Sequence, residues 1–161
     1  FNAAPEMTID TTKTYVATIE RDKGMILMEL DPALAPITVN NFVTLANLGF
    51  YDNMPVAHVE PETYMVLGSP GGNPASDVGY TLPLEAGTEP SSIITGTVSM
   101  YPVAGDTGEF LASGSQFFIA FSVVPESATP LNIFGEVTEG MDIAQQMAIG
   151  DIIKSITITE K

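Results

Sequence analysis

The chain has 161 residues, 45% of them hydrophobic and 16% charged, which fits one domain with a sizeable core and is not the composition of a disordered chain. The absence of Cys and the single His exclude disulfides, thiolate chemistry and multi-histidine metal sites. A formal net charge of −15 argues against charge-driven binding to nucleic acid or to an anionic membrane surface.

The N-terminal part of the sequence predicts a tail followed by two strands. Residues 1–12 are mostly polar and show no clear period, so we expect a tail there and a folded domain over residues 13–161. From Tyr15 to Glu20, alternate residues fall on opposite faces, which is the period of a β-strand. Gly24 can supply the positive φ of a tight turn, and Met25–Leu30 then predicts the second strand.

A helix is predicted after this pair of strands. Pro36 suits the first turn of a helix. Val39, Phe42, Val43 and Ala46 then follow with the i, i+3, i+4, i+7 spacing of an amphipathic helix. We expect the helix to end near Gly49, which occupies a typical C-terminal capping position.

The rest of the chain predicts short strands, long loops and a second helix. A short helix is expected over Met141–Ile149, ended by Gly150. Many short strands separated by Gly- and Pro-rich turns are typical of a barrel or a sandwich, and two helices that can cover open ends favour the barrel. The further predicted strands are Met54–Val59, Tyr64–Leu67, Gly96–Met100, Gln116–Phe121, Asn132–Val137 and Ile152–Thr159.

His58, the only histidine, lies in the predicted strand Met54–Val59 and has two interpretations. The first is an ordinary strand histidine at the surface or in a hydrogen bond, and the second is a residue of a functional site. A Ser-His-Asp hydrolase is not favoured, because the sequence has no G-x-S-x-G elbow. The carboxylates show no calcium-loop spacing, and Gly71-Gly72 lacks the Lys of a phosphate loop. We therefore expect no metal or cofactor.

The strand Gln116–Phe121 is apolar on both faces. Gln116, Phe118 and Ala120 share one face, whereas Phe117, Ile119 and Phe121 share the other. Taken alone, this pattern predicts a strand of the core.

The sequence resembles the cyclophilins, a family of peptidyl-prolyl cis-trans isomerases, over about residues 14–160. The order and spacing of several short segments together carry this resemblance. These segments are Asn41-Phe42-Val43, Gly49-Phe50-Tyr51-Asp52, Gly79-Tyr80-Thr81-Leu82-Pro83, Gly96-Thr97-Val98-Ser99-Met100, Gly114-Ser115-Gln116-Phe117-Phe118-Ile119 and Phe134-Gly135-Glu136-Val137. The resemblance implies a mainly β fold, a closed eight-stranded antiparallel barrel capped by two helices.

The likeness is weakest in the active site. The family's strand Phe-His-Arg-Val carries the main catalytic Arg, and the matching stretch here is Val56-Ala57-His58-Val59, so His58 stands at the Arg position. The family's Phe-Met-Ile-Gln corresponds to Tyr64-Met65-Val66-Leu67 after one extra residue at Glu62-Thr63. Its later Trp and His fall near Glu126 and Leu131. A longer loop, Tyr101 to Ser113, replaces its Asn-containing loop.

The resemblance therefore implies a prolyl isomerase that is weakened by the loss of the guanidinium. Its catalytic residue would be His58. The residues implied to bind substrate are Tyr64, Met65, Gln116, Phe118 and Leu131. The partners would be proline-containing peptides or proteins.

Two alternatives remain beside this interpretation. The same pocket can bind proline peptides without catalysis, or Leu67, Tyr101 or Leu131 can fill it and leave a scaffold. No apolar run reaches the roughly 18–20 residues of a membrane span, so we expect no transmembrane segment. We also expect a monomer that binds no nucleic acid. An acidic chain that starts at Phe1 is compatible with a processed, extracytoplasmic protein.

Overall fold

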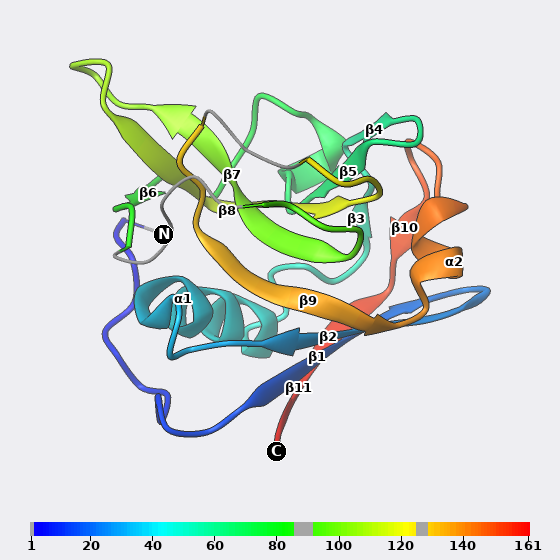
Figure 1. Ribbon diagram of the computed structural model, residues 1–161, viewed down its shortest axis with the longest axis horizontal. Helices are drawn as coiled ribbons and strands as arrows, with labels where there is room; N and C mark the ends of the chain where they lie inside the picture. The colour runs from blue at the N-terminus through cyan, green and yellow to red at the C-terminus, as the bar shows by residue number, and fades with distance from the viewer. Residues whose placement is uncertain (1, 86–91, 125–128) are drawn as a thin grey trace.

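The computed structural model describes residues 2–85, 92–124 and 129–161, and most of its strands form one antiparallel sheet (Figure 1). The strands of the sheet follow one another in the order β11-β1-β2-β9-β7-β8-β5-β4, and β6 pairs with β8 beside this path. Their bounds are β1 Tyr15–Arg21, β2 Gly24–Leu30, β4 His58–Glu60, β5 Tyr64–Leu67, β6 Thr81–Leu82, β7 Thr97–Ala104, β8 Phe110–Ala120, β9 Ile133–Glu139 and β11 Ser155–Glu160. A separate pair consists of β3 (Met54–Pro55) and β10 (Ile152–Ile153).

The first two strands form the predicted hairpin. Arg21 pairs with Gly24 at its end, and Gly24 has a φ of 136°, a conformation that an L side chain rarely adopts. Further along the pair, Ile19 lies opposite Ile26, and both side chains are fully buried. The alternation in the sequence thus places one face of this hairpin in the core.

The first helix, α1 (Pro36–Asn47), is confirmed at its predicted position. Phe42, on the inward face of this helix, is fully buried and contacts Phe117 of β8 edge-on, with ring centroids 5.2 Å apart. Asn41 is also buried, and its amide donates to the backbone carbonyl of Gly114 at 2.7 Å. The helix therefore packs its apolar face against the sheet and satisfies its buried polar group there.

The second helix, α2, spans Met141–Gln145 and is shorter than the predicted Met141–Ile149. Gln146 caps its end, and the Asp151 carboxylate accepts a hydrogen bond from the backbone N–H of Ala148 at 2.9 Å. This local bond holds the following residues in a turn instead of a further helical turn. Helices α1 and α2 lie toward opposite ends of the curled sheet (Figure 1).

The sheet is an open, strongly curled half-barrel, so the prediction of a closed eight-stranded barrel is wrong in this respect (Figure 1). Across the described residues, the end strands β11 and β4 do not pair with each other. The short pair of β3 with β10 joins the chain segments that precede them, and the Val56 N–H extends this contact by donating to the Asp151 carbonyl at 2.8 Å. Pro61 follows β4 directly and has no N–H to donate, so β4 ends there.

The predicted long loop over Tyr101–Ser113 is instead mostly a β-hairpin. Strands β7 and β8 continue through it, with Val103 opposite Leu111 and Ala104 opposite Phe110. The register shifts between Met100 and Pro102, and the hairpin projects beyond the rest of the sheet (Figure 1). The β-strand β6 and the short 3₁₀ turn at Pro70–Gly72 were not predicted.

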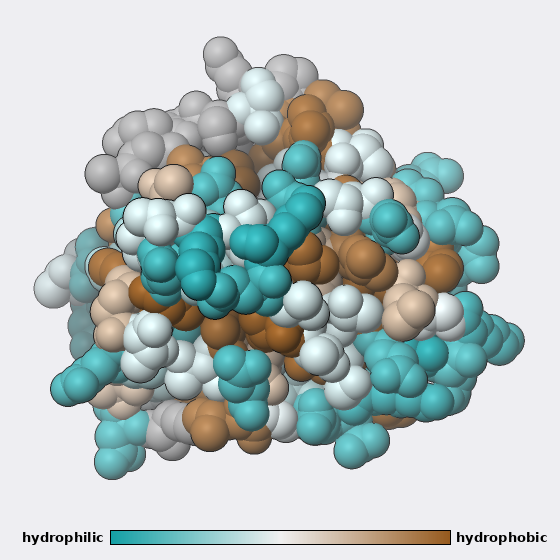
Figure 2. All heavy atoms as spheres, turned by 90° about the horizontal axis from the view of Figure 1, so that it is seen from below, coloured by the Kyte–Doolittle hydropathy of each residue, from teal (hydrophilic) through white to brown (hydrophobic). Residues whose placement is uncertain are grey.

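The N-terminal segment, predicted as a tail, contacts α1 through Asn40. The Asn40 side-chain oxygen accepts from the Thr8 backbone N–H at 2.8 Å, and its amide donates to the Glu6 carbonyl at 3.0 Å. In the described parts of the chain, no helix combines the length and the apolar character needed to cross a bilayer. The face seen in Figure 2 carries hydrophilic side chains over much of its area, with hydrophobic atoms visible between them.

Candidate functional site

An apolar cleft of about 310 Å³ opens on the outer face of β5 and β8. Antiparallel pairing sets Val66 of β5 opposite Phe118 of β8, and Tyr64 opposite Ala120, so these residues share one face. We call it the Phe118 cleft; residues that line it include Tyr64, Ile93, Tyr101, Phe118, Val124 and Leu131. Its lining is predominantly aliphatic and aromatic, which is typical of a small-molecule or peptide side-chain site.

The rings of Tyr64 and Phe118 form the aromatic part of this cleft. Their centroids are 6.0 Å apart with an interplanar angle of 62°, an edge-to-face arrangement that aromatic pairs favour. Phe118 is 8% exposed, so its ring is held in place and still reaches the surface of the cleft. Burial raises the pKa of the Tyr64 phenol, with smaller contributions from Tyr101 and Glu60. A tyrosine hydroxyl keeps its proton at neutral pH even without this shift, so Tyr64 can donate a hydrogen bond.

Leu131 forms another wall of the cleft, and its neighbour Asn132 fixes that wall. Asn132 is fully buried, and its amide donates to the Pro83 carbonyl at 2.9 Å and to the Thr38 hydroxyl at 3.1 Å. The Asn132 side-chain oxygen accepts from the Glu85 backbone N–H at 3.1 Å. A buried amide with all of these bonds made is a rigid anchor for the backbone beside it.

A long-range bridge closes a further side of the cleft. Ile93 and Val124 exchange two backbone hydrogen bonds, each 2.8 Å long. Neither residue belongs to a predicted strand, and the sequence analysis did not include either in the site. The short apolar pair Ile93-Ile94 next to a turn indicates a short extended segment. Nothing in the local sequence indicates that Ile93 pairs with Val124, which lies 31 residues further along the chain.

His58 lies beside the cleft and outside its lining. It pairs with Val66 across β4 and β5, and Val66 in turn pairs with Phe118, so His58 and Phe118 face the same side. Two strand spacings separate their backbones, which corresponds to about 10 Å. The His58 ring centroid is 6.0 Å from that of Tyr64, and its Nε2 is 3.5 Å from a Glu60 carboxylate oxygen. The Glu60 carboxylate is thus a direct neighbour of the His58 ring.

Met65 and Gln116, both predicted to bind substrate, lie outside the lining of the Phe118 cleft. Met65 is fully buried in the main core on the opposite face of β5 from Tyr64, so the structure does not bring it together with Phe118. Leu67 faces the same core and does not fill the cleft. The Gln116 amide donates to the carbonyls of Pro74 at 3.0 Å and Ser76 at 2.7 Å, so it holds the loop over Ser69–Gly79.

Glu126, which stands near the position of the family's Trp, is outside the described residues. Within the described ranges, no group of three or more His, Asp and Glu side chains is arranged to hold a metal ion. What the cleft offers chemically is an apolar surface for a small ring, the Tyr64 hydroxyl and a nearby imidazole.

Comparison with known proteins places this fold and cleft in context. Residues 15–160 match the family model described as cyclophilin type peptidyl-prolyl cis-trans isomerase/CLD. Peptidyl-prolyl cis-trans isomerase B of Bacillus subtilis is 37% identical over 137 residues, which cover 85% of this chain and 92% of that protein. A peptidyl-prolyl cis-trans isomerase of Helicobacter pylori is 34% identical over 152 residues, covering 93% and 90%.

Solved structures show the same fold at lower identity. A Cryptosporidium parvum cyclophilin type peptidyl-prolyl cis-trans isomerase, crystallised in the presence of the dipeptide Ala-Pro, superposes with a TM-score of 0.74 at 21% identity. That match covers 91% of this chain and 99% of the other. The Mimivirus cyclophilin has a TM-score of 0.69 at 17% identity, covering 99% and 96%.

Proposed function

This chain belongs to the cyclophilin-type peptidyl-prolyl cis-trans isomerases, and we propose that it isomerises Xaa-Pro bonds at the Phe118 cleft with a weaker donor than arginine. The observation that supports this site is the apolar cleft itself, with the Phe118 ring at its surface and Tyr64 edge-on beside it. A prolyl ring is apolar and small, and Phe118 and Leu131 offer it matching surface. The peptide partners are accordingly proline-containing segments of other polypeptides.

The chemistry requires a twisted imide bond in the transition state. Amide resonance opposes rotation with a barrier of about 18–20 kcal/mol. A hydrogen-bond donor aimed at the prolyl nitrogen stabilises the twisted, unconjugated state, because the nitrogen lone pair is available only there. An apolar cleft also removes water from the imide, which favours the less polar twisted form.

The donor in this chain cannot be a lysine or arginine of the elements that build the cleft. No Lys or Arg occurs from Gly24 through Ile153, a range that includes all of its lining residues. His58 occupies the position beside Tyr64, and in protonated form it is the strongest donor near the cleft. Loss of one preorganised donor commonly costs about 2.7–4 kcal/mol, or roughly 10²–10³ in rate. We therefore propose reduced turnover, with His58 as the catalytic donor.

Tyr64 contributes both a wall and a second donor. Its hydroxyl stays protonated at neutral pH, and its ring contacts both His58 and Phe118. The proposed substrate-binding residues are thus Tyr64, Phe118 and Leu131. Gln116 acts indirectly by holding the loop over Ser69–Gly79, and Met65 supports β5 from the core side.

A second candidate function is a proline-peptide binding module without useful catalysis. One observation favours it: His58 is about 10 Å from Phe118 by strand spacing, and its imidazole hangs on a single methylene. An arginine at that position would carry its donor on three methylenes. A bound imide beside Phe118 would then depend on hydroxyl groups of the lining, such as those of Tyr64 and Tyr101.

The two functions separate in an NMR exchange measurement on a peptide with one Ala-Pro bond. An isomerase that uses the protonated His58 imidazole as its donor should turn over faster as the pH of the measurement is lowered. The His58→Ala variant should lose this rise, whereas Tyr64→Phe should keep it at a lower overall rate. Saturable binding with cis-trans exchange at the uncatalysed rate would establish the binding module instead. A flat pH profile that His58→Ala leaves unchanged would remove His58 from the mechanism.

We further propose that residues 13–161 form the functional unit and that it acts as a monomer without nucleic acid. The net charge of −15 supports the second part, because phosphate backbones repel such a surface.

A further inference from the structure

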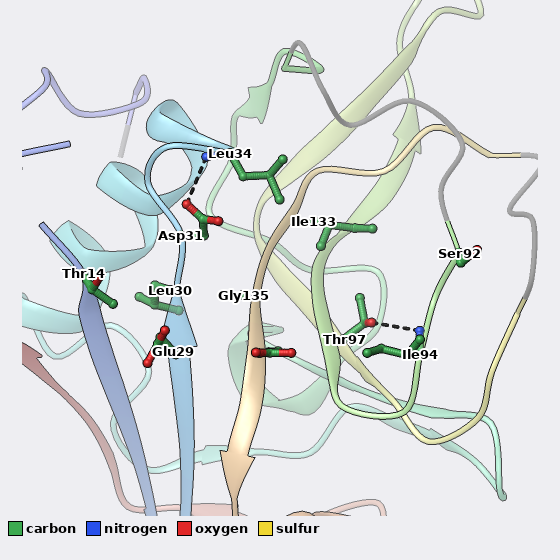
Figure 3. Close-up of a pocket in the computed structure, with 11 residues that line it drawn as sticks. Thr14, Glu29, Leu30, Asp31, Leu34, Ser92, Ile94, Thr97, Ile133 and Gly135 are labelled. Atoms are coloured by element: carbon green, nitrogen blue, oxygen red, sulfur yellow. Dashed lines mark hydrogen bonds between the residues drawn. The ribbon is translucent and has the colours of Figure 1, made fainter. Parts of the chain in front are cut away.

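A second cleft, of about 540 Å³, shares a wall with the Phe118 cleft. Figure 3 shows the residues that line this second cleft. Neighbouring residues of the wall face different clefts: Ile93 lines the Phe118 cleft and Ile94 lines the second one. The same holds at the start of β9, where Leu131 lines the Phe118 cleft and Ile133 lines the second cleft. We call the second one the acidic cleft; residues that line it include Glu29, Asp31, Leu34, Ile94, Ile133 and Glu136.

Two of its carboxylates are in direct cross-strand register. Glu29 of β2 lies opposite Glu136 of β9, next to the pair Leu30 and Gly135. A Cβ atom on Gly135 would lie 2.5 Å from the Glu29 carbonyl oxygen, so the two strands approach closely here. Like charges directly opposite each other destabilise a sheet. A positive charge placed between these two carboxylates would offset the repulsion.

The chain itself shows that a primary ammonium can bind at this rim. Lys161 places its Nζ 3.2 Å from a Glu29 carboxylate oxygen, although the lysine side chain is 67% exposed. Across the described residues, Glu136 has no ion pair with a Lys, Arg or His side chain. Asp31 adds a third carboxylate, oriented by hydrogen bonds from the backbone N–H groups of Ala33 at 3.0 Å and Leu34 at 3.2 Å.

The floor of the cleft is aliphatic. Ile94 is 51% exposed, and Leu34 and Ile133 are half-buried and line the same cleft. A lysine or arginine side chain combines an aliphatic stem with a terminal cation, so it can cover this apolar surface and reach the carboxylates at the same time. A free metal ion or a small amine would use the charge and leave the apolar surface exposed.

We propose that the acidic cleft binds a lysine or arginine side chain of the same polypeptide whose Xaa-Pro bond occupies the Phe118 cleft. This inference rests on the proposed function and specifies its substrate class: prolines with a basic residue a short distance away in sequence. The two clefts are adjacent, so a peptide already bound through its Pro can place its basic residue in the acidic cleft without a second encounter. This raises the effective concentration of the basic residue at that site. Extended chain covers about 3.3–3.6 Å per residue, so a spacing of about three to five residues reaches across one strand segment.

The test compares two fluorescein-labelled peptides that differ at one position. Both peptides contain one Ala-Pro unit in a Gly/Ser background. At one position the first peptide carries Lys and the second carries Glu. A series of such pairs places this position three, four or five residues before or after the Pro. We expect the Lys peptide to bind about fivefold more tightly at the best spacing, as two exposed ion pairs would give. This preference should fall below about twofold at roughly 0.5 M NaCl, because salt screens exposed charges.

The variant Glu29→Gln/Glu136→Gln should abolish the preference for the Lys peptide. The matched control Glu20→Gln/Glu139→Gln removes the same charge away from the cleft and should keep the preference. Glu136→Gln should also unfold at an equal or higher temperature than the wild type, since it removes a like-charge pair. Equal binding of the two peptides to a wild type that isomerises both would overturn the acidic-cleft proposal alone. Absence of exchange with either peptide would instead contradict the proposed function.

Discussion

Strands β5 and β8 carry apolar residues on both faces, and the two faces have different surroundings. On the inner face, Phe117, Ile119 and Met65 are fully buried. On the outer face, Phe118 and Tyr64 belong to a small separate cluster that borders the Phe118 cleft. Residues next to each other in sequence thus serve different layers of the molecule.

What covers each face explains the difference. Helix α1 lies over the inner face, and the Phe42 ring packs edge-on against Phe117, which leaves that face dry. Over the outer face, the described chain supplies the bridge between Ile93 and Val124 and the segment at Leu131, and a cleft of about 310 Å³ remains. An apolar residue without a complete cover is available to a ligand.

The largest expected effect comes from breaking the inner face. Phe117→Ala should lower the free energy of unfolding by about 3–5 kcal/mol, because it opens a cavity among fully buried rings. Urea denaturation followed by circular dichroism measures this. Phe118→Ala is the matched control and should cost clearly less, since its ring already borders an open cleft. Equal losses for the two variants would mean that the outer face is also structural.

Substitutions on the outer face should reduce activity more than they reduce stability. Phe118→Ala should reduce kcat/KM for an Ala-Pro peptide by about 10- to 100-fold, because a fully buried Phe-sized contact is worth about 1.5–3 kcal/mol. The measurement is NMR exchange on variants whose folded state has been verified. Met65→Leu is the control from the inner face of β5 and should leave kcat/KM nearly unchanged. A large loss with Met65→Leu would show that the core side of β5 also determines the cleft.

Much of the fold could be predicted from the sequence, because local patterns set it. The period-2 alternation of Tyr15–Glu20, the turn at Gly24 and the i, i+3, i+4 spacing after Pro36 each depend on neighbouring residues alone. The openness of the sheet could not be predicted in this way. It depends on whether the end strands β11 and β4, which are far apart in sequence, pair with each other, and in the described residues they do not.

The candidate site was predictable only in part. The family resemblance and the alternation of β8 place Phe118 on an outer face, and the structure agrees with that placement. Met65 was assigned to the cleft by matching residue types with an extra residue at Glu62-Thr63, and a one-residue change of register moves a strand side chain to the other face. Ile93 and Val124 meet through tertiary contacts that no local pattern announces.

Tyrosine ionisation sharpens the comparison of the two faces. Burial, with a smaller effect from Tyr80, raises the pKa of the inner Tyr51 well above its usual value of about 10, whereas burial raises that of Tyr64 in the cleft by less. Because the folded state holds these protons more tightly than the unfolded state, stability is complete below about pH 10 and falls above it. The slope is up to about 1.4 kcal/mol per pH unit for each group.

Urea denaturation between about pH 9 and 11 measures this loss of stability. Tyr51→Phe should flatten the alkaline decline most, and Tyr64→Phe should flatten it less. The reverse ranking would indicate that the cleft is drier than the core side.

The smallest expected effect is that of Glu85→Gln, a substitution at the start of α1. The Glu85 carboxylate accepts hydrogen bonds from the backbone N–H groups of Ile37 at 2.7 Å and Thr38 at 3.0 Å, where the helix dipole favours a negative charge. Glu85→Gln keeps the shape but removes the charge, so it should cost about 0.5–1 kcal/mol in the free energy of unfolding.

Since the Glu85 N–H also bonds Asn132 beside Leu131, this variant should lower kcat/KM by less than about twofold. Glu62→Gln, in an exposed turn, is the matched control and should leave stability unchanged within about 0.5 kcal/mol. If Glu85→Gln instead reduced activity as strongly as Phe118→Ala with little loss of stability, the helix start would act on the cleft directly, and the division between a structural inner face and a binding outer face would fail.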